Sequence, residues 1–274
     1  MVKRILKKAK NIFFANPELL YREERQFVNK PFYFEGANGK AALLLHGWTC
    51  TPYEVRRLGK YLNERGYTVS GIQFSGHGTV PKDLEGIKWQ TWVDDALRGY
   101  DELKANHEKV YIVGTSIGAN VAMVLAKEKP DISAIVLMAA PYKLKLESLV
   151  VAFAKFLSLF GNIYNKKFYP PTFGSAATVT RLISYQTYPI ISALEAFDLI
   201  KQSRKGLEKI EHPCFILQST HDHIVTKDSM EIIYSSISSK KKKKQYIEKA
   251  YHTFISDIKN EHVFKDIFDF LEEN

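Results

Sequence analysis

The feature that most constrains the fold of this chain is a serine between two glycines, in the segment Gly114-Thr-Ser-Ile-Gly118. An apolar, mostly β-branched run at residues 110–113 precedes this segment, and alanines at helical spacing follow it. A strand that turns so quickly into a helix needs a sharp bend, and the glycines remove Cβ atoms that would clash there. The pattern therefore predicts a strand–turn–helix unit that exposes the hydroxyl of Ser116 at a helix N-terminus, where negative charge is favoured.

Length and composition are those of an ordinary globular protein. The 274 residues can enclose one large core, with 45% of them hydrophobic and 25% charged. No apolar run approaches the roughly 18 residues that a membrane-spanning helix needs. Cys50 and Cys214 lie far apart beside apparent core strands and match no metal or redox spacing. We interpret them as free thiols of a cytoplasmic protein, although the sequence alone leaves a disulfide between them open.

The net charge of +9 comes from two lysine-rich segments rather than from the body of the chain. Residues 1–10 carry five positive charges and no acidic ones, and residues 240–244 are five lysines. The rest of the chain is close to neutral, which argues against a nucleic-acid-binding surface spread over the fold. We interpret the lysine run as part of a solvated loop.

Residues 1–30 are predicted to form a separate, basic N-terminal segment. Within its first fifteen residues, apolar side chains recur at helical spacing with lysines between them, as in amphipathic helices that lie on a lipid surface. Peripheral membrane contact is one interpretation, and packing of Ile5, Ile12 and Phe13 on the domain is the alternative. A secretory signal is disfavoured because neither an apolar core of the usual length nor a small-residue cleavage site follows the charges.

Apolar runs alternate with amphipathic segments along the rest of the chain. Helices are predicted at residues 53–65, 89–106, 147–160, 190–209 and 263–271, in addition to the one after the glycine–serine turn. Strands are predicted at residues 31–35, 41–45, 67–72, 110–113, 132–138, 213–218 and 244–248. This alternation predicts an α/β fold with a doubly wound, mostly parallel sheet.

One interval interrupts the alternation. More than seventy residues separate the strands at residues 132–138 and 213–218, too many for one crossover helix. We interpret residues 142–188 as a helical cap inserted into a core formed by residues 31–141 and 189–274, above the edge of the sheet where ligands bind. The apolar excess of this cap favours a lipophilic binding tunnel, with ordinary packing on the core as the alternative.

A serine hydroxyl becomes a strong nucleophile only when a base takes its proton and a third group orients that base. In a sheet of this kind the partners follow later strands, in the chain order serine, acid, histidine. Asp222 follows the strand at residues 213–218 by four residues, and His252 follows the strand at residues 244–248 likewise. We therefore predict Ser116 as the nucleophile, His252 as the base and Asp222 as the orienting acid.

The other histidines are interpreted as structural. His221 and His223 flank Asp222, and a base taken from the same loop as its acid would break the expected order. His77 lies between two glycines and His46 ends a strand, so we expect both to shape loops. No motif such as H-E-x-x-H occurs, and neither a metal nor another cofactor is predicted.

Acyl transfer also creates an oxyanion, which needs preorganised backbone donors. The turn itself supplies one donor, the N–H of Ile117 directly after the nucleophile. The second is expected from the loop after the strand at residues 41–45, where Gly47 lets the backbone approach closely. We assign this donor to the N–H of Trp48, whose indole is also expected to wall the acyl site.

Five segments together resemble the α/β-hydrolase superfamily, and within it the bacterial carboxylesterase and monoacylglycerol lipase group. They are LLLHGW, F-x-GHG, VGTSIG, HDHIV and EKAYHT, and their order and spacing extend over residues 40–272. The resemblance implies hydrolysis of short- to medium-chain carboxylic esters, often monoglycerides, without a cofactor. Two departures are Ala119, where many relatives carry a second glycine, and the additional basic N-terminus.

The leading hypothesis is a serine esterase that acts on small lipophilic esters through an acyl-enzyme intermediate. A thioesterase or acyltransferase is the alternative, because the same triad serves thioesters and other acyl acceptors. A binding protein with a vestigial hydrolase fold would need a broken triad, and the sequence contains all three expected members.

Overall fold

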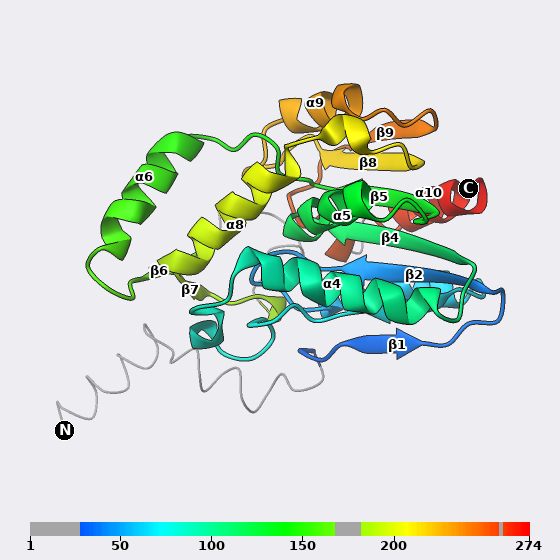
Figure 1. Ribbon diagram of the computed structural model, residues 1–274, viewed down its shortest axis with the longest axis horizontal. Helices are drawn as coiled ribbons and strands as arrows, with labels where there is room; N and C mark the ends of the chain where they lie inside the picture. Colours follow the sequence, from blue (N-terminus) through cyan, green and yellow to red (C-terminus); the bar gives the residue numbers. More distant parts are fainter. Residues whose placement is uncertain (1–27, 168–181, 258–259) are drawn as a thin grey trace.

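A seven-stranded sheet in the order β1-β3-β2-β4-β5-β8-β9 forms the centre of the molecule (Figure 1). The computed structural model describes residues 28–167, 182–257 and 260–274. β1 pairs antiparallel with β3, and all other neighbouring strands pair in parallel, which confirms the predicted mostly parallel sheet. The strands are β1 (Phe32–Phe34), β2 (Lys40–Leu45), β3 (Thr68–Gly71), β4 (Lys109–Thr115), β5 (Ala134–Met138), β8 (Cys214–Ser219) and β9 (Lys242–Ile247).

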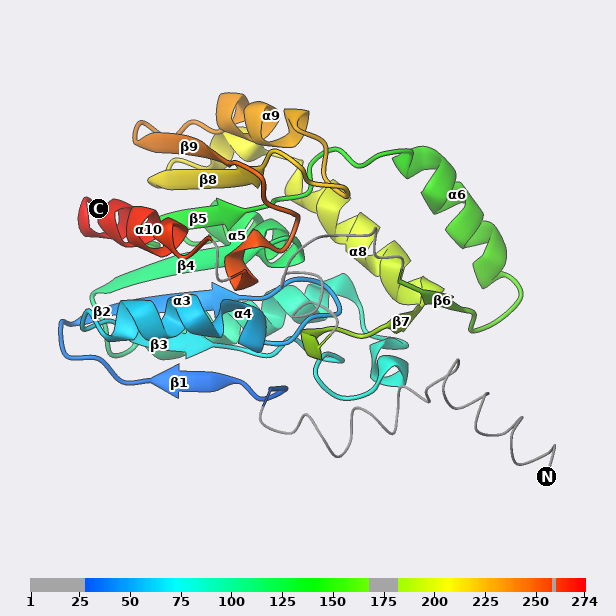
Figure 2. The same ribbon diagram turned by 180° about the vertical axis from the view of Figure 1, so that it is seen from behind.

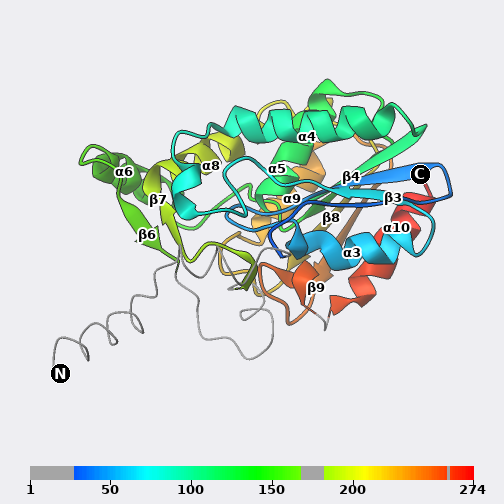
Figure 3. The ribbon, with the colours of Figure 1, turned by 90° about the horizontal axis from the view of Figure 1, so that it is seen from below.

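Helices cover both faces of this sheet, as Figures 1 and 2 show from opposite sides. One face carries α4 (Trp89–Lys104), α5 (Ile117–Glu128), α8 (Ile190–Ser203) and α9 (Asp228–Ser236), and the other carries α3 (Tyr53–Asn63) and α10 (His262–Glu272). In Figure 3 the sheet lies between α4 and the pair formed by α3 and α10. The described residues also form short 3₁₀ helices: η1 (Pro81–Leu84), η2 (Leu207–Lys209) and η3 (Phe254–Ser256).

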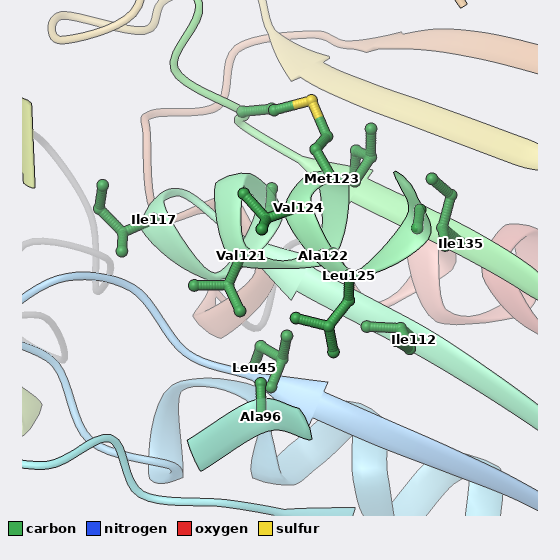
Figure 4. Close-up of a cluster of buried hydrophobic side chains, with 14 of the residues drawn as sticks. Leu45, Ala96, Ile112, Ile117, Val121, Ala122, Met123, Val124, Leu125 and Ile135 are labelled. Carbon is green, nitrogen blue, oxygen red and sulfur yellow. The ribbon is translucent and has the colours of Figure 1, made fainter. Parts of the chain in front are cut away.

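The central strands separate two hydrophobic cores. Side chains of β2 alternate, so that Leu43 and Leu45 face α4 and α5 while Leu44 faces α3 and α10. Figure 4 shows the first of these cores, in which Val121 of α5 points toward Leu45 and Ala96 of α4. A strand covered on both faces gains burial at every position, which explains why β2 is a continuous apolar run in the sequence.

The described part of the predicted cap lies beyond the carboxyl ends of the parallel strands (Figures 1 and 2). It contains α6 (Glu147–Ser158) and an antiparallel pair, β6 (Tyr164–Lys166) and β7 (Thr187–Pro189). The Arg204 guanidinium, just after α8, donates to both oxygens of Glu147 at 2.8 and 2.6 Å, which fixes the start of α6. The Tyr185 hydroxyl donates to the Gly76 carbonyl at 2.9 Å and so ties this region to the core. The cap boundaries at residues 142 and 188 stay a prediction.

Helix α6 exposes most of its apolar side chains. Ala154 is its one buried residue, whereas Leu149 and Phe153 are 69% and 62% exposed. The predicted lipophilic tunnel stays a prediction, because residues 168–181 of the cap lie outside the described residues. Within the ranges described, none of the helices combines the length and the apolar character needed to cross a bilayer.

The lysine run lies largely in an edge strand, so its interpretation as a loop was wrong. β9 begins at Lys242, two residues earlier than predicted, and pairs with β8. Lys242 Nζ donates to the carbonyls of Tyr234 and Ile237 at 2.8 and 3.0 Å, and Lys243 Nζ lies 4.7 Å from the ring centroid of Phe215. Long lysine stems cover apolar neighbours while their charges block pairing with another sheet, so an edge strand accommodates them well.

Two helix predictions also differ from the structure. Helix α9 was not predicted, because only Met230 and Ile233 give it buried apolar positions. Helix α8 ends at Ser203 instead of continuing to Lys209, since Gly206 adopts a left-handed φ of 66° and a short 3₁₀ turn follows. Most of the predicted N-terminal segment, residues 1–27, lies outside the described residues.

Candidate active site

Ser116 occupies the turn between β4 and α5 in a strained conformation, with φ 52° and ψ −122°. A Cβ added at Gly114 would lie 2.3 Å from the Gly118 carbonyl oxygen, and one added at Gly118 would lie 2.4 Å from that of Leu45. Both positions therefore require glycine, as the sequence predicted. The N–H of Ser116 donates to the Met138 carbonyl at 2.8 Å and fixes the turn against β5. Such strain is typical of functional residues.

His252 and Asp222 reach Ser116 from loops that follow β9 and β8. The distance from His252 Nε2 to Ser116 Oγ is 2.9 Å, and that from His252 Nδ1 to Asp222 Oδ2 is 2.7 Å. A neutral imidazole protonated on Nδ1 donates to Asp222 and leaves Nε2 free to accept the serine proton. The structure thus brings together the three residues that the sequence predicted.

The Asp222 carboxylate is held by more than its histidine. Oδ1 accepts the N–H groups of Ile224 and Val225 at 2.8 and 2.9 Å, and Oδ2 accepts the Gln218 amide at 3.0 Å. Burial acts to raise the pKa of Asp222, but His252 and the backbone donors more than offset this, so the pKa lies below its ordinary value. The carboxylate therefore stays ionised and fixed in orientation.

The environment of His252 favours its protonated form. Burial acts to lower the pKa of His252, yet the charge and hydrogen bond of Asp222 outweigh it, and the pKa lies above the ordinary value of 6.5. Glu54 adds in the same direction, whereas Lys167 opposes it. An imidazolium formed when Ser116 loses its proton would be stabilised here.

The two predicted oxyanion donors lie beside the nucleophile. Ile117 is the first residue of α5, and Trp48 directly follows Gly47. A Cβ added at Gly47 would lie 3.3 Å from the Cβ of Ser116. Within the described ranges, the N–H groups of Ile117 and Trp48 have no hydrogen-bond acceptor. The Trp48 ring meets that of Tyr188 edge-on, with centroids 4.6 Å apart. Their role as oxyanion donors stays a prediction.

His46 and His77 shape the adjoining loops, as expected. His46 Nε2 accepts the Phe74 N–H at 3.1 Å and Nδ1 donates to the Gly47 carbonyl at 2.9 Å. Burial lowers the pKa of His46 to about 4, which keeps the ring neutral. His77 is also buried, and this burial holds its pKa well below the ordinary value.

The sequence did not predict two polar residues that lie beside Ser116, His252 and Asp222. Gln218 supports Asp222, and the Glu54 carboxylate, 2% exposed, accepts the Gly47 N–H at 2.6 Å. Gln218 ends a predicted strand, and Glu54 has the position of an ordinary acid in the first turn of a helix. Neither pattern signals a contact with the site.

The described residues contain no cluster of three or more His, Cys, Asp or Glu side chains arranged to hold a metal ion. Cys50 and Cys214 are buried free thiols.

Sequence comparisons relate most of the chain to known hydrolases. Residues 37–259 match the family described as serine aminopeptidase, S33. A carboxylesterase of Bacillus subtilis (strain 168) is 34% identical over 245 residues, which cover 89% of this chain and 96% of that protein. A thermostable monoacylglycerol lipase of Bacillus sp. (strain H-257) is 31% identical over 231 residues, covering 83% and 88%.

A solved structure supports the fold independently. The structure reported for the metagenome-derived lipolytic enzymes LipS and LipT superposes with a TM-score of 0.80 at 23% identity, and the match covers 90% of this chain and 99% of that one. At this identity the likeness establishes the arrangement of strands and helices.

Proposed function

The chain belongs to the serine aminopeptidase S33 family of α/β-hydrolases, and from this premise we propose that it hydrolyses carboxylic esters with lipophilic acyl chains. The observation that carries the proposal is the hydrogen-bonded chain from Ser116 through His252 to Asp222. These three residues are proposed as the catalytic triad. The curated relatives, one a carboxylesterase and the other a monoacylglycerol lipase, support an ester as the substrate.

In the proposed mechanism, Ser116 Oγ attacks the ester carbonyl carbon while His252 Nε2 takes the hydroxyl proton. The N–H groups of Ile117 and Trp48 bind the oxyanion, each worth about 3 kcal/mol of barrier. His252 then gives its proton to the leaving alcohol, which departs and leaves an acyl-enzyme on Ser116. A water molecule, deprotonated by His252, attacks this intermediate and releases the acid, with Asp222 stabilising the imidazolium in both halves.

A substrate panel tests this proposal and the class of acyl compound. We expect p-nitrophenyl esters from acetate to laurate to be hydrolysed best at short to medium chain lengths, with monoacylglycerols of the same length also cleaved. Acyl-CoA thioesters and aminoacyl p-nitroanilides of matched size serve as comparisons and are expected to have lower kcat/KM. A higher kcat/KM for the thioesters would favour the thioesterase alternative, and a preference for the anilides would indicate a peptidase.

We further propose that the protein is cytoplasmic and contacts anionic membrane surfaces through its N-terminal segment. Five positive charges and no acidic ones in residues 1–10, with apolar residues at helical spacing, support this contact. The exposed apolar side chains of α6, among them Leu149 and Phe153, offer a further surface for lipid. The buried free thiols support a reducing compartment.

Vesicle pelleting tests the membrane proposal. Full-length protein is expected to pellet with anionic vesicles more than a variant that lacks residues 1–16, and the difference should shrink with neutral vesicles or added salt. Equal pelleting of the two proteins with anionic vesicles would contradict a role for the N-terminal segment.

A further inference from the structure

The peptide bond between Gly47 and Trp48 is held from its carbonyl side. The Gly47 carbonyl oxygen accepts the Nδ1–H of His46 at 2.9 Å and the N–H of Cys50 at 3.1 Å. The described chain contains no cis peptide, and in a trans peptide the C=O and N–H point in opposite directions. Two donors on the Gly47 oxygen therefore fix the direction in which the N–H of Trp48 points.

The preceding peptide is held by Glu54. Its Oε2 accepts the Gly47 N–H at 2.6 Å, which is short, as expected for a charge-assisted bond. A Cβ at Gly47 would be 3.1 Å from this same oxygen and 3.3 Å from the Cβ of Ser116. The Gly47 backbone is thus in close contact with both a buried carboxylate and the nucleophile. A shift of Gly47 in either direction would also move Trp48.

We propose that Glu54 is a positioning residue for the oxyanion hole, whose hydrogen bond to Gly47 sets the place of the Trp48 N–H relative to Ser116. This inference rests on the proposed function, because an oxyanion hole has a role only if the site transfers acyl groups. The inference assigns a positioning role to a buried carboxylate that is not one of the three proposed catalytic residues.

The buried environment of Glu54 supports this positioning role. A buried carboxyl group is costly unless hydrogen bonds offset its loss of water, and here the Gly47 N–H donates to Glu54. Burial raises the pKa of Glu54, while Gly47, His252 and Lys167 act against that rise. An apolar side chain in the same space would lack an acceptor for the Gly47 N–H, so the carboxylate supplies a contact with the loop that such a side chain could not.

Glu54 also contributes to the charge around His252. The charged and titratable groups that act on this imidazole are Asp222, Glu54, Lys167 and His223. The carboxylate of Glu54 raises the pKa of His252, in the same direction as Asp222. Loss of its charge is therefore expected to move the acid limb of the pH profile of kcat/KM to lower pH.

Kinetics of two substitutions test the positioning role. Glu54→Ala removes the acceptor of the Gly47 N–H and is expected to lower kcat for p-nitrophenyl butyrate about 100-fold, with KM nearly unchanged. Glu54→Gln keeps an acceptor of the same shape and should restore kcat to within about fivefold of wild type, with the acid limb displaced to lower pH. The control is Glu64→Gln, the same change at an exposed position just after α3.

A spectroscopic measurement follows the contact without relying on turnover. Labelling with ¹³C-carbonyl histidine and ¹⁵N-glycine selects the two His-Gly pairs of the chain, His46-Gly47 and His77-Gly78. A short bond to a carboxylate shifts an amide proton downfield, so the Gly47 signal is expected far downfield in wild type and further upfield in Glu54→Gln. The Gly78 signal is the internal control and should keep its position. This readout also covers the case in which Glu54→Ala does not fold.

The outcomes separate this inference from the function on which it rests. Full kcat in folded Glu54→Ala, or an unmoved Gly47 signal in Glu54→Gln, would overturn the positioning role while wild-type turnover upheld the esterase. Wild-type protein that hydrolyses none of the esters would instead overturn the proposed function, and the positioning role with it. A loss of kcat in Glu54→Ala, rescue by glutamine and an upfield Gly47 signal would support both.

Discussion

Replacing Ser116 by alanine should lower kcat for p-nitrophenyl butyrate about a million-fold, because it removes the attacking atom and leaves only binding and the oxyanion donors. The fold should be retained. Alanine keeps the Cβ of serine, so the backbone strain at φ 52° is unchanged, and among the described residues the hydrogen bond that is lost is that to His252 Nε2. The melting temperature of the variant is therefore expected to stay close to that of wild type.

Steady-state kinetics and labelling with a fluorophosphonate probe measure this effect together. The matched control is Ser235→Ala on the exposed side of α9, prepared in parallel, which is expected to keep wild-type turnover after the same serine-to-alanine change. Wild type and the control should label with the probe, and Ser116→Ala should not. Turnover that persists in a folded Ser116→Ala protein would exclude Ser116 as the nucleophile.

Replacing Asp222 by asparagine should lower kcat about 10,000-fold and also change its pH dependence. The amide can donate to His252 Nδ1, which stabilises the tautomer that cannot accept the serine proton. Catalysis needs neutral His252, and the Asp222 carboxylate holds the pKa of this histidine above 6.5. Without the negative charge the pKa of His252 falls, so the acid limb of kcat/KM should move to lower pH.

A pH profile of kcat/KM for wild type and Asp222→Asn tests both parts of this prediction. Asp228→Asn is the control, because Asp228 is exposed in α9 and its ion pair is with Lys143. The control should keep the wild-type profile. An acid limb that stays in place in Asp222→Asn would mean that another group controls the protonation of His252.

The convergence of Ser116, Asp222 and His252 could be predicted from the sequence because the place of each residue depends on a local pattern. The glycines around Ser116 mark the turn, and Asp222 and His252 each follow a predicted strand by a few residues. Parallel strands bring their carboxyl ends to one edge of the sheet, so the positions of loops along the chain were sufficient to predict their convergence. The shift of β9 by two residues did not affect this, since His252 still follows it in the same loop.

The support of the loop at Gly47 could not be predicted in the same way. The contact of Glu54 with Gly47 depends on how the first turn of α3 returns beneath the end of β2, which only three-dimensional packing determines. Helix α9 and the lysines of β9 were missed for a related reason. Both lie at the sheet edge, where side chains face solvent and the apolar periodicity that reveals buried elements is weak.

Gly118 allows a contact between main-chain atoms beside Ser116 that amino-acid substitutions around the site leave in place. The start of α5, which carries Ile117, lies directly against the main chain at the end of β2. A Cβ added at Gly118 would be only 2.4 and 2.7 Å from the carbonyl oxygens of Leu45 and His46, just before Trp48. Main-chain atoms are common to every sequence, so this contact does not depend on which side chains surround Ser116. Side chains around Ser116 can therefore be exchanged while the close approach of α5 to the end of β2 is kept.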